Sequence, residues 1–193
     1  MHTPSDNYTL LLASKSPRRR ELIGKLGFPV RCIDIVADER LHDHVASNEV
    51  AQHIAQLKAN AYTAPLQPNE ILITADTVVV LDNKVLGKPA SRDEARAMLQ
   101  MLSARTHLVY TGVCLRTQHR QQQFTEMSKV QFKKLDKITI EYYLDQNSYS
   151  DKAGSYGIQD WIGYVAVERI EGCYYNVMGL PMAHLYQAIT ELL

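Results

Sequence analysis

The chain has 193 residues, 46% of them hydrophobic and 22% charged, which is enough to bury a substantial core in one domain, or in one domain of two lobes. Its 21 basic and 21 acidic residues cancel, so bulk charge indicates neither nucleic-acid nor membrane binding, and an anion site must come from a local cluster. No apolar run reaches transmembrane length, and the polar first residues do not resemble a secretory signal.

The first predicted element is a strand that leads through a short loop into a helix. Leu10–Ala13 is typical of a buried strand, and polar residues 14–16 end it. Ser16 suits the N-cap and Pro17 the first helical turn, because the N–H that proline lacks would have no partner there. The cations Arg18–Arg20 oppose the helix dipole at this end. They indicate either an anion site or a solvated basic face.

A second strand is predicted at Val30–Ile35, after Gly27 ends the helical pattern. The polar loop that follows holds His42 and His44 on either side of a carboxylate. Two interpretations stay open for these histidines, a metal site or an exposed loop. Ser47 is then predicted to cap the next helix.

Two charged residues further along have both a structural and a functional interpretation. Lys58, near the end of that helix, either complements the helix dipole or takes part in a site. Asp76 lies within the β-branched sequence Ile71–Leu81, where a buried carboxylate needs a cation or a metal as partner. The alternative is that Asp76 marks a turn between two shorter strands. Asp82-Asn83 predicts a hairpin turn after this segment.

The second half of the chain combines helices with a long hairpin. Its predicted elements are a helix from Ser91 to about Leu102, strands at Thr106–Thr117 and Gln123–Phe132, a helix from Thr139 to about Gln146, a strand at Tyr164–Ile170 and a helix from Pro181 through Leu192. Ser91 and Glu94 form a capping box. The loop Asp151–Gln159 has two glycines that match neither a Walker pattern nor a dinucleotide fingerprint. Alternation early and a hairpin later predict a mixed sheet.

The three cysteines lie far apart in the sequence, at Cys32, Cys114 and Cys173. An odd number without paired spacing argues against a disulfide framework and against a zinc site. We therefore expect buried, reduced thiols in a cytoplasmic protein.

Taken together, these motifs resemble the Maf family of nucleotide pyrophosphatases. The matching segments, in the family's order over nearly the whole chain, are Ala13-Ser14-Lys15-Ser16-Pro17-Arg18-Arg19, Asp38-Glu39, Lys58, Ala75-Asp76-Thr77, Gly87-Lys88-Pro89 and Asp151-Lys152-Ala153-Gly154. The resemblance implies a single domain over residues 1–193 with a Maf/ITPase-like α/β fold. Such a fold has an elongated central mixed β-sheet flanked by helices, and two lobes with a nucleotide cleft. The resemblance also implies cleavage between the α and β phosphates of a nucleoside triphosphate with a divalent metal, Mg²⁺ or Mn²⁺.

Individual residues acquire roles from the same resemblance. Asp76 matches the family's catalytic proton acceptor, and Glu39 matches an acidic loop residue, so both are expected to ligate the metal. Carboxylate oxygens are hard ligands that suit Mg²⁺ and Mn²⁺. Positions that match polar or basic groups lining the nucleotide cleft are Ser14, Ser16, Arg18, Arg19, Lys58, Lys88 and Lys152.

Three positions favour one subfamily. Arg18, Thr77 and Gln159 resemble the dTTP/UTP type and differ from the 7-methyl-GTP type, so thymine and uracil nucleotides are the expected substrates, with modified pyrimidine nucleotides as further candidates. The alternatives are a 7-methyl-GTP pyrophosphatase and a non-catalytic nucleotide-binding regulator of cell division. We expect a cytoplasmic enzyme whose partner is its nucleoside triphosphate, without a stable nucleic-acid or membrane partner; a homodimer stays open.

Overall fold

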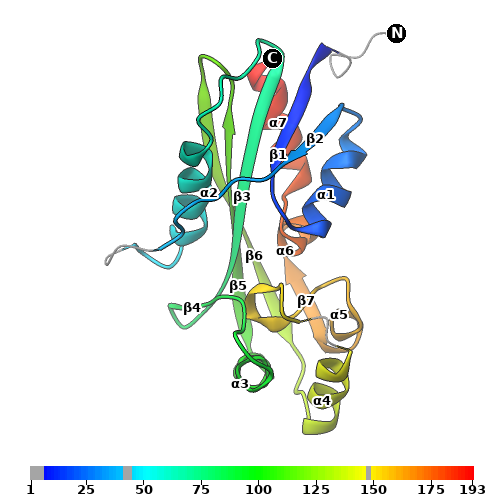
Figure 1. Cartoon of the computed structure of the whole chain (residues 1–193). Helices are drawn as coiled ribbons and strands as arrows, with labels where there is room; N and C mark the ends of the chain where they lie inside the picture. The colour runs from blue at the N-terminus through cyan, green and yellow to red at the C-terminus, as the bar shows by residue number, and fades with distance from the viewer. Residues whose placement is uncertain (1–6, 41–44, 147–148) are drawn as a thin grey trace. The chain divides into compact units, whose positions relative to one another are not determined.

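The computed structural model describes residues 7–40, 45–146 and 149–193. Over these residues the protein is α/β, with a seven-stranded mixed sheet in the order β2-β1-β3-β5-β6-β7 and with β4 paired to β3 (Figure 1). The strands are β1 (Thr9–Ala13), β2 (Val30–Ile33), β3 (Glu70–Leu81), β4 (Lys84–Leu86), β5 (Thr106–Arg116), β6 (Gln121–Phe132) and β7 (Val167–Glu171). The helices are α1 (Pro17–Ile23), α2 (Val50–Ala61), α3 (Arg92–Leu102), α4 (Lys137–Asp145), α5 (Trp161–Ala166), α6 (Tyr174–Met178) and α7 (Met182–Leu192).

The chain divides into two compact units. Unit 1 holds the described residues of Met1–Asp76, Thr111–Glu126 and Gly179–Leu193, and unit 2 holds those of Thr77–Tyr110 and Met127–Met178. Three boundaries fall inside β3, β5 and β6, so each of these strands contributes residues to both units, and the fourth follows Met178 at the end of α6.

Unit 1 is organised around parallel strands. β1 pairs in parallel with β2 and with β3, with Leu10 opposite both Val30 and Ile71. A parallel strand in the middle of a sheet is covered on both faces, and the neighbours Leu10 and Leu11, which point to opposite faces, are both fully buried. Ala13, the last residue of β1, lies opposite Thr74. The loop that follows β1 therefore begins level with the part of β3 just before Asp76.

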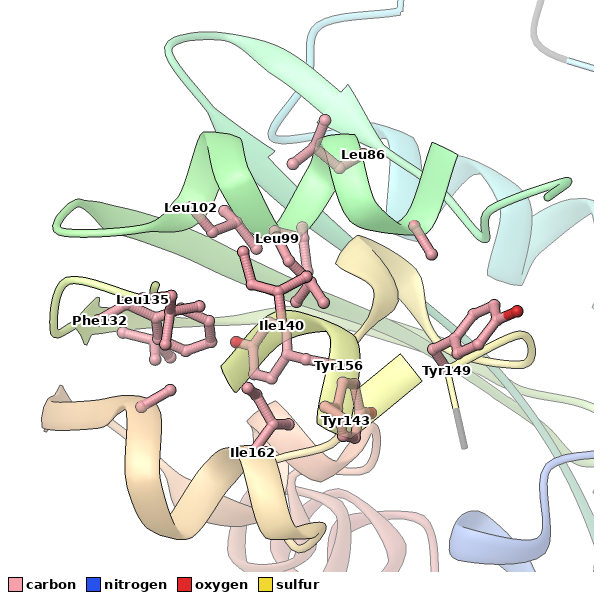
Figure 2. Packing of buried hydrophobic residues seen from close by; sticks show 14 of the residues in the cluster. Leu86, Leu99, Leu102, Phe132, Leu135, Ile140, Tyr143, Tyr149, Tyr156 and Ile162 are labelled. Atoms are coloured by element: carbon pink, nitrogen blue, oxygen red, sulfur yellow. The ribbon is translucent and has the colours of Figure 1, made fainter. Parts of the chain in front are cut away.

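Unit 2 has a core of its own, built from strands and helices of residues 77–110 and 127–178. Figure 2 shows apolar side chains of α3 and α4 meeting the rings of Phe132 and Tyr156. The Phe132 and Tyr156 rings pack edge to face with centroids 4.8 Å apart. The predicted hairpin turn is present, because Asp82 and Asn83 take positive φ angles of 49° and 63° between β3 and β4.

Most predicted elements are confirmed with small shifts at their ends. Ser16 caps α1 by accepting from the Arg19 backbone N–H, and Pro17 is its first residue. Ser91 caps α3 by accepting from Glu94 N–H, while Glu94 reaches back to Ala90 N–H at 2.7 Å. None of the helices in the described ranges is long and apolar enough to cross a membrane.

The prediction that Ser47 caps α2 is wrong. The helix begins at Val50, and its N-cap is Glu49, which makes no side-chain capping hydrogen bond. The backbone N–H of Glu49 instead donates to Ala46 O at 2.8 Å. Because of this turn, the helix begins three residues after Ser47.

The predicted strand at Tyr164–Ile170 is also only partly right. Its first residues belong to α5, and β7 begins at Val167. The β-branched and aromatic residues favour a strand, but packing overrides that preference. Gly163 lies so close to the backbone of Ile158 that any Cβ there would overlap the Ile158 carbonyl. This contact keeps the segment folded against the preceding loop.

The expectation of buried thiols is right for one cysteine and wrong for another. Cys114 is buried within unit 1, Cys32 is exposed on β2, and Cys173 is half-buried.

Candidate functional site

Three of the predicted site residues meet at one ammonium group in unit 1. Lys58 Nζ lies 2.8 Å from Asp76 Oδ1 and 3.3 Å from Glu39 Oε1. The side chains of Lys58 and Asp76 are only 16% and 18% exposed, whereas Glu39 is 50% exposed. Breaking one partner of such a largely desolvated pair would leave an uncompensated charge. The cluster thus brings two carboxylates to one ammonium group.

The strand that carries Asp76 settles two alternatives left open by the sequence. β3 runs without a break from Glu70 to Leu81, so the interpretation of Asp76 as a turn residue is wrong. Its partner is a cation, Lys58, in the last turn of α2. Lys58 therefore does more than complement the helix dipole.

Close packing fixes α2, and with it Lys58, against the sheet of unit 1. The helix turns small residues toward the sheet, and Ala55 and Ala59 are fully buried. Thr74 Oγ1 on β3 donates to Ala55 O at 2.6 Å. On β5, a Cβ at Gly112 would overlap the backbone of Gln52, so only glycine permits this approach.

The arginines after β1 have different partners. Arg19 is 9% exposed, and its guanidinium donates to Gly179 O at 2.7 Å and to Ala75 O at 2.9 Å. Burial lowers the pKa of Arg19, and the nearby carboxylate of Asp76 partly opposes this effect. Arg19 thus holds the backbone immediately before Asp76. Its predicted contact with the nucleotide stays a prediction.

The loop between β1 and α1 is fastened by its own polar groups. Ser14 Oγ accepts from the Ser16 N–H at 3.2 Å, and Ser16 Oγ accepts from the Arg19 N–H at 3.5 Å. Arg20, which the sequence left without a role, donates to Ser14 O at 2.9 Å and lies 3.7 Å from Asp34. Arg18 is half-buried, and its charge lowers the pKa of Arg19 further.

In unit 2, Lys152 stands between two carboxylates much as Lys58 does in unit 1. Lys152 Nζ lies 2.9 Å from Asp151 Oδ1 and 3.3 Å from Asp160 Oδ2, and its side chain is 9% exposed. Gln159 Nε2 donates to Asp160 Oδ1 at 3.1 Å. Two predicted residues, Lys152 and Gln159, are therefore joined through Asp160, which the sequence did not single out. The available signal was an acid directly after Gln159, in the N-cap position of α5.

Two further sequence motifs meet within unit 2. The Gly154 N–H donates to Gly87 O at 3.0 Å, which joins the glycine loop to the segment that carries Lys88. Gly154 has φ of 67°, a conformation that side chains rarely adopt. Lys88 is exposed, and Thr77 is half-buried in β3.

The chemistry of the acidic residues fits a divalent cation. No group of three or more His, Cys, Asp or Glu side chains converges in residues 7–40, 45–146 and 149–193. Mg²⁺ is commonly held by one or two carboxylates together with waters and substrate phosphates, which matches the pair Glu39 and Asp76. His42 and His44 lie outside the described residues.

Comparison with known proteins gives consistent matches. A family model described as Maf-like protein matches residues 9–192. A protein of Bacteroides thetaiotaomicron named dTTP/UTP pyrophosphatase is 48% identical over 189 residues, 97% of each chain. A protein of the same name from Parabacteroides distasonis is 50% identical over 186 residues, 95% of this chain and 96% of the other. The solved structure of the Staphylococcus aureus Ham1 protein shares the fold, with a TM-score of 0.53, 14% identity, and coverage of 95% of this chain and 98% of that chain.

Proposed function

Because this chain belongs to the Maf family, we propose that it is a nucleoside triphosphate pyrophosphatase that hydrolyses dTTP and UTP to the monophosphate and pyrophosphate. The observation that carries the proposal is the convergence of Glu39, Lys58 and Asp76 in unit 1. Relatives named dTTP/UTP pyrophosphatase that match nearly the whole chain support the choice of substrate.

The cluster supplies groups suited to hydrolysis of a phosphoanhydride. Asp76 accepts the proton of the attacking water as the water oxygen bonds to the α phosphorus. The bond from that phosphorus to the bridging oxygen between the α and β phosphates breaks, and pyrophosphate leaves with the electron pair. Lys58 orients Asp76 before the substrate arrives, and phosphate oxygens then compete for its ammonium group.

A divalent cation, Mg²⁺ or Mn²⁺, belongs to this proposal. Glu39 and Asp76 are the residues that would hold it, since both carboxylates lie beside the Lys58 ammonium group. When bound, the ion would neutralise charge on the phosphate oxygens.

Base selection is proposed to involve Arg18, Thr77 and Gln159. Thymine and uracil present two carbonyl acceptors around an N3–H donor, whereas cytosine presents an amine and an acceptor at N3. Arg18 can only donate, and Gln159 offers both a donor and an acceptor. A site built on such pairs rejects a base that leaves buried polar groups unpaired.

The test is a panel of dTTP, UTP, CTP, ATP, GTP and 7-methyl-GTP with detection of pyrophosphate. We expect metal-dependent release of pyrophosphate from dTTP and UTP well above the other nucleotides, loss of turnover on chelation, and recovery with Mg²⁺ or Mn²⁺. Orthophosphate as the sole inorganic product would contradict cleavage between the α and β phosphates. Preference for 7-methyl-GTP would contradict the choice of base. We place the enzyme in the cytoplasm, where these nucleotides are made and used.

A further inference from the structure

The carboxylate of Asp160 divides its two oxygens between different partners in unit 2. Oδ2 accepts from the Tyr143 hydroxyl at 3.2 Å and lies 3.3 Å from Lys152 Nζ. Oδ1 accepts from Gln159 Nε2 at 3.1 Å. One oxygen is therefore held by a cation and a phenol, and the other is left for the amide of Gln159.

This arrangement determines which end of the Gln159 amide faces Asp160. An ionised carboxylate only accepts hydrogen bonds, so the NH₂ group must face it and the carbonyl oxygen must turn away. The reversed amide would bring two acceptors to the 3.1 Å separation that Nε2 now occupies. Oε1 of Gln159 is buried and has no hydrogen-bond partner among the residues that the structure describes. An unpaired buried acceptor is costly, and a donor from a ligand would remove that cost.

The backbone of the loop leaves room for the carboxylate. An ideal Cβ at Gly157 would lie 2.5 Å from Asp160 Oδ2 and 2.8 Å from Lys152 Cε. The Asp160 N–H also donates to Gly157 O at 3.0 Å, which closes the turn. Glycine at position 157 leaves this space to the Asp160 carboxylate and the Lys152 side chain, and a larger residue there would push one of them aside.

We propose that Asp160 is a positioning residue for base selection, which holds the NH₂ of Gln159 so that Oε1 is the group offered to the N3–H of uracil or thymine. The inference rests on the proposed function and deepens it. Cytosine has an acceptor at N3, which would face Oε1 without a proton between them. The half-buried Gln159 side chain has to expose Oε1 to the base as the base binds.

Asp160→Asn gives a directional test of this role. The donors Lys152 and Tyr143 would hold the new carbonyl oxygen, which places the new NH₂ where Oδ1 was. Gln159 must then turn its own oxygen toward Asn and offer its NH₂ to the base. We expect the ratio of kcat/KM for UTP to that for CTP to fall roughly 10- to 100-fold, mainly through KM.

Two matched variants separate positioning from general packing. Tyr143→Phe removes a donor to Oδ2 but leaves Oδ1 and Gln159 in place. Asp151→Asn removes the other carboxylate on Lys152 without touching Gln159. Both variants are expected to keep the wild-type UTP-to-CTP ratio, whatever their effect on overall rate. Binding of UMP and CMP can be followed by the fluorescence of the single tryptophan, Trp161, next to Asp160. The ratio of the two dissociation constants measures base preference without turnover.

The outcomes distinguish this inference from the proposed function. A wild-type protein that treats UTP and CTP equally contradicts the proposed function itself. A folded Asp160→Asn protein that keeps the wild-type ratio overturns the positioning role and leaves the function intact. An equal loss of the ratio in Tyr143→Phe and Asp151→Asn also overturns it, because the effect would then come from loop packing.

Discussion

At the scale of single residues, this protein uses lysines to hold carboxylates in place. Lys58 contacts Asp76 and Glu39 in unit 1, and Lys152 contacts Asp151 and Asp160 in unit 2. In both groups one carboxylate is largely buried and the other is about half exposed. The buried member depends on its lysine to offset the cost of desolvation, whereas the exposed member keeps part of its contact with water.

Asp76→Asn tests the buried member in unit 1. The change keeps the size of the side chain but removes its charge and its ability to take a proton. Loss of general-base action should lower turnover roughly 10²–10⁴-fold, and more if a metal ligand is lost as well. Steady-state release of pyrophosphate measures the effect.

Asp145→Asn is a suitable control for that experiment, since it removes a carboxylate that is 69% exposed at the end of α4. Near-normal turnover in a folded Asp76→Asn protein would exclude Asp76 from the chemistry.

At the scale of secondary-structure elements, the position of α2 decides the position of Lys58. The helix approaches β5 at Gly112 and β3 through the bond from Thr74 to Ala55 O. The apolar positions of the sequence predict the helix. They do not show that the helix backbone packs against Gly112 on a strand far along the chain. The caps of α1 and α3 were predictable because Ser16 and Ser91 act on backbone groups three residues away.

Gly112→Ala should displace α2. Its Cβ would overlap backbone atoms of Gln52, which cannot move as a flexible side chain can. Overpacking of this kind costs about 1–3 kcal/mol of unfolding free energy, and the shift should also lower turnover by moving Lys58. Thermal unfolding and pyrophosphate release measure the two effects.

Gly24→Ala in the same unit is the matched control, because nothing lies within 4 Å of a Cβ there and its φ is −61°. We expect Gly24→Ala to leave stability nearly unchanged. Equal effects of the two substitutions would show that α2 does not depend on Gly112.

At the scale of the whole molecule, the chain builds two units with separate cores, and three of the four boundaries between them cut strands. Asp76 and Thr77 are neighbours in sequence but belong to different units. The core of unit 2 contains a buried polar group, His107, whose Nε2 lies 2.7 Å from the Tyr156 hydroxyl. Its ring packs edge to face on Phe132 and on Tyr156. This histidine connects β5 to Tyr156 in the loop Asp151–Gln159.

The pH dependence of stability should reveal His107. Burial lowers its pKa from 6.5 to about 4, so the unfolded chain takes up a proton at a higher pH than the folded one. The contribution of neutral His107 to the free energy of unfolding is therefore fully present above pH 6.5 and decreases as the pH falls. Below the folded pKa the total loss reaches about 3 kcal/mol. Urea unfolding between pH 7 and pH 4, followed by Trp161 in unit 2, measures this loss.

His107→Phe keeps a ring among these aromatic neighbours and removes the titrating group. We expect the variant to lose less stability than the wild type between pH 6.5 and pH 4, because carboxylates contribute equally to both proteins. The same pH slope in both would rule out His107 as the cause.

Features that depend on near neighbours in the chain were predictable before the fold was known. The buried strand at Leu10–Ala13, the cap at Ser16 and the turn at Asp82-Asn83 follow from local hydrophobicity and backbone preference. The ordered motifs also pointed to the family that the comparisons match.

The partners of the charged groups, by contrast, depend on how distant segments pack. Lys58 meets Asp76 across 18 residues, and Arg19 meets Gly179 across 160. The same holds for the start of β7, which follows α5 because Gly163 packs on Ile158, and for the sharing of Asp160 between Lys152 and Gln159. The physical reason is that a group becomes buried, and gains distant hydrogen-bond partners, only when the segments pack together. Local preferences of the chain do not specify which distant segments will meet.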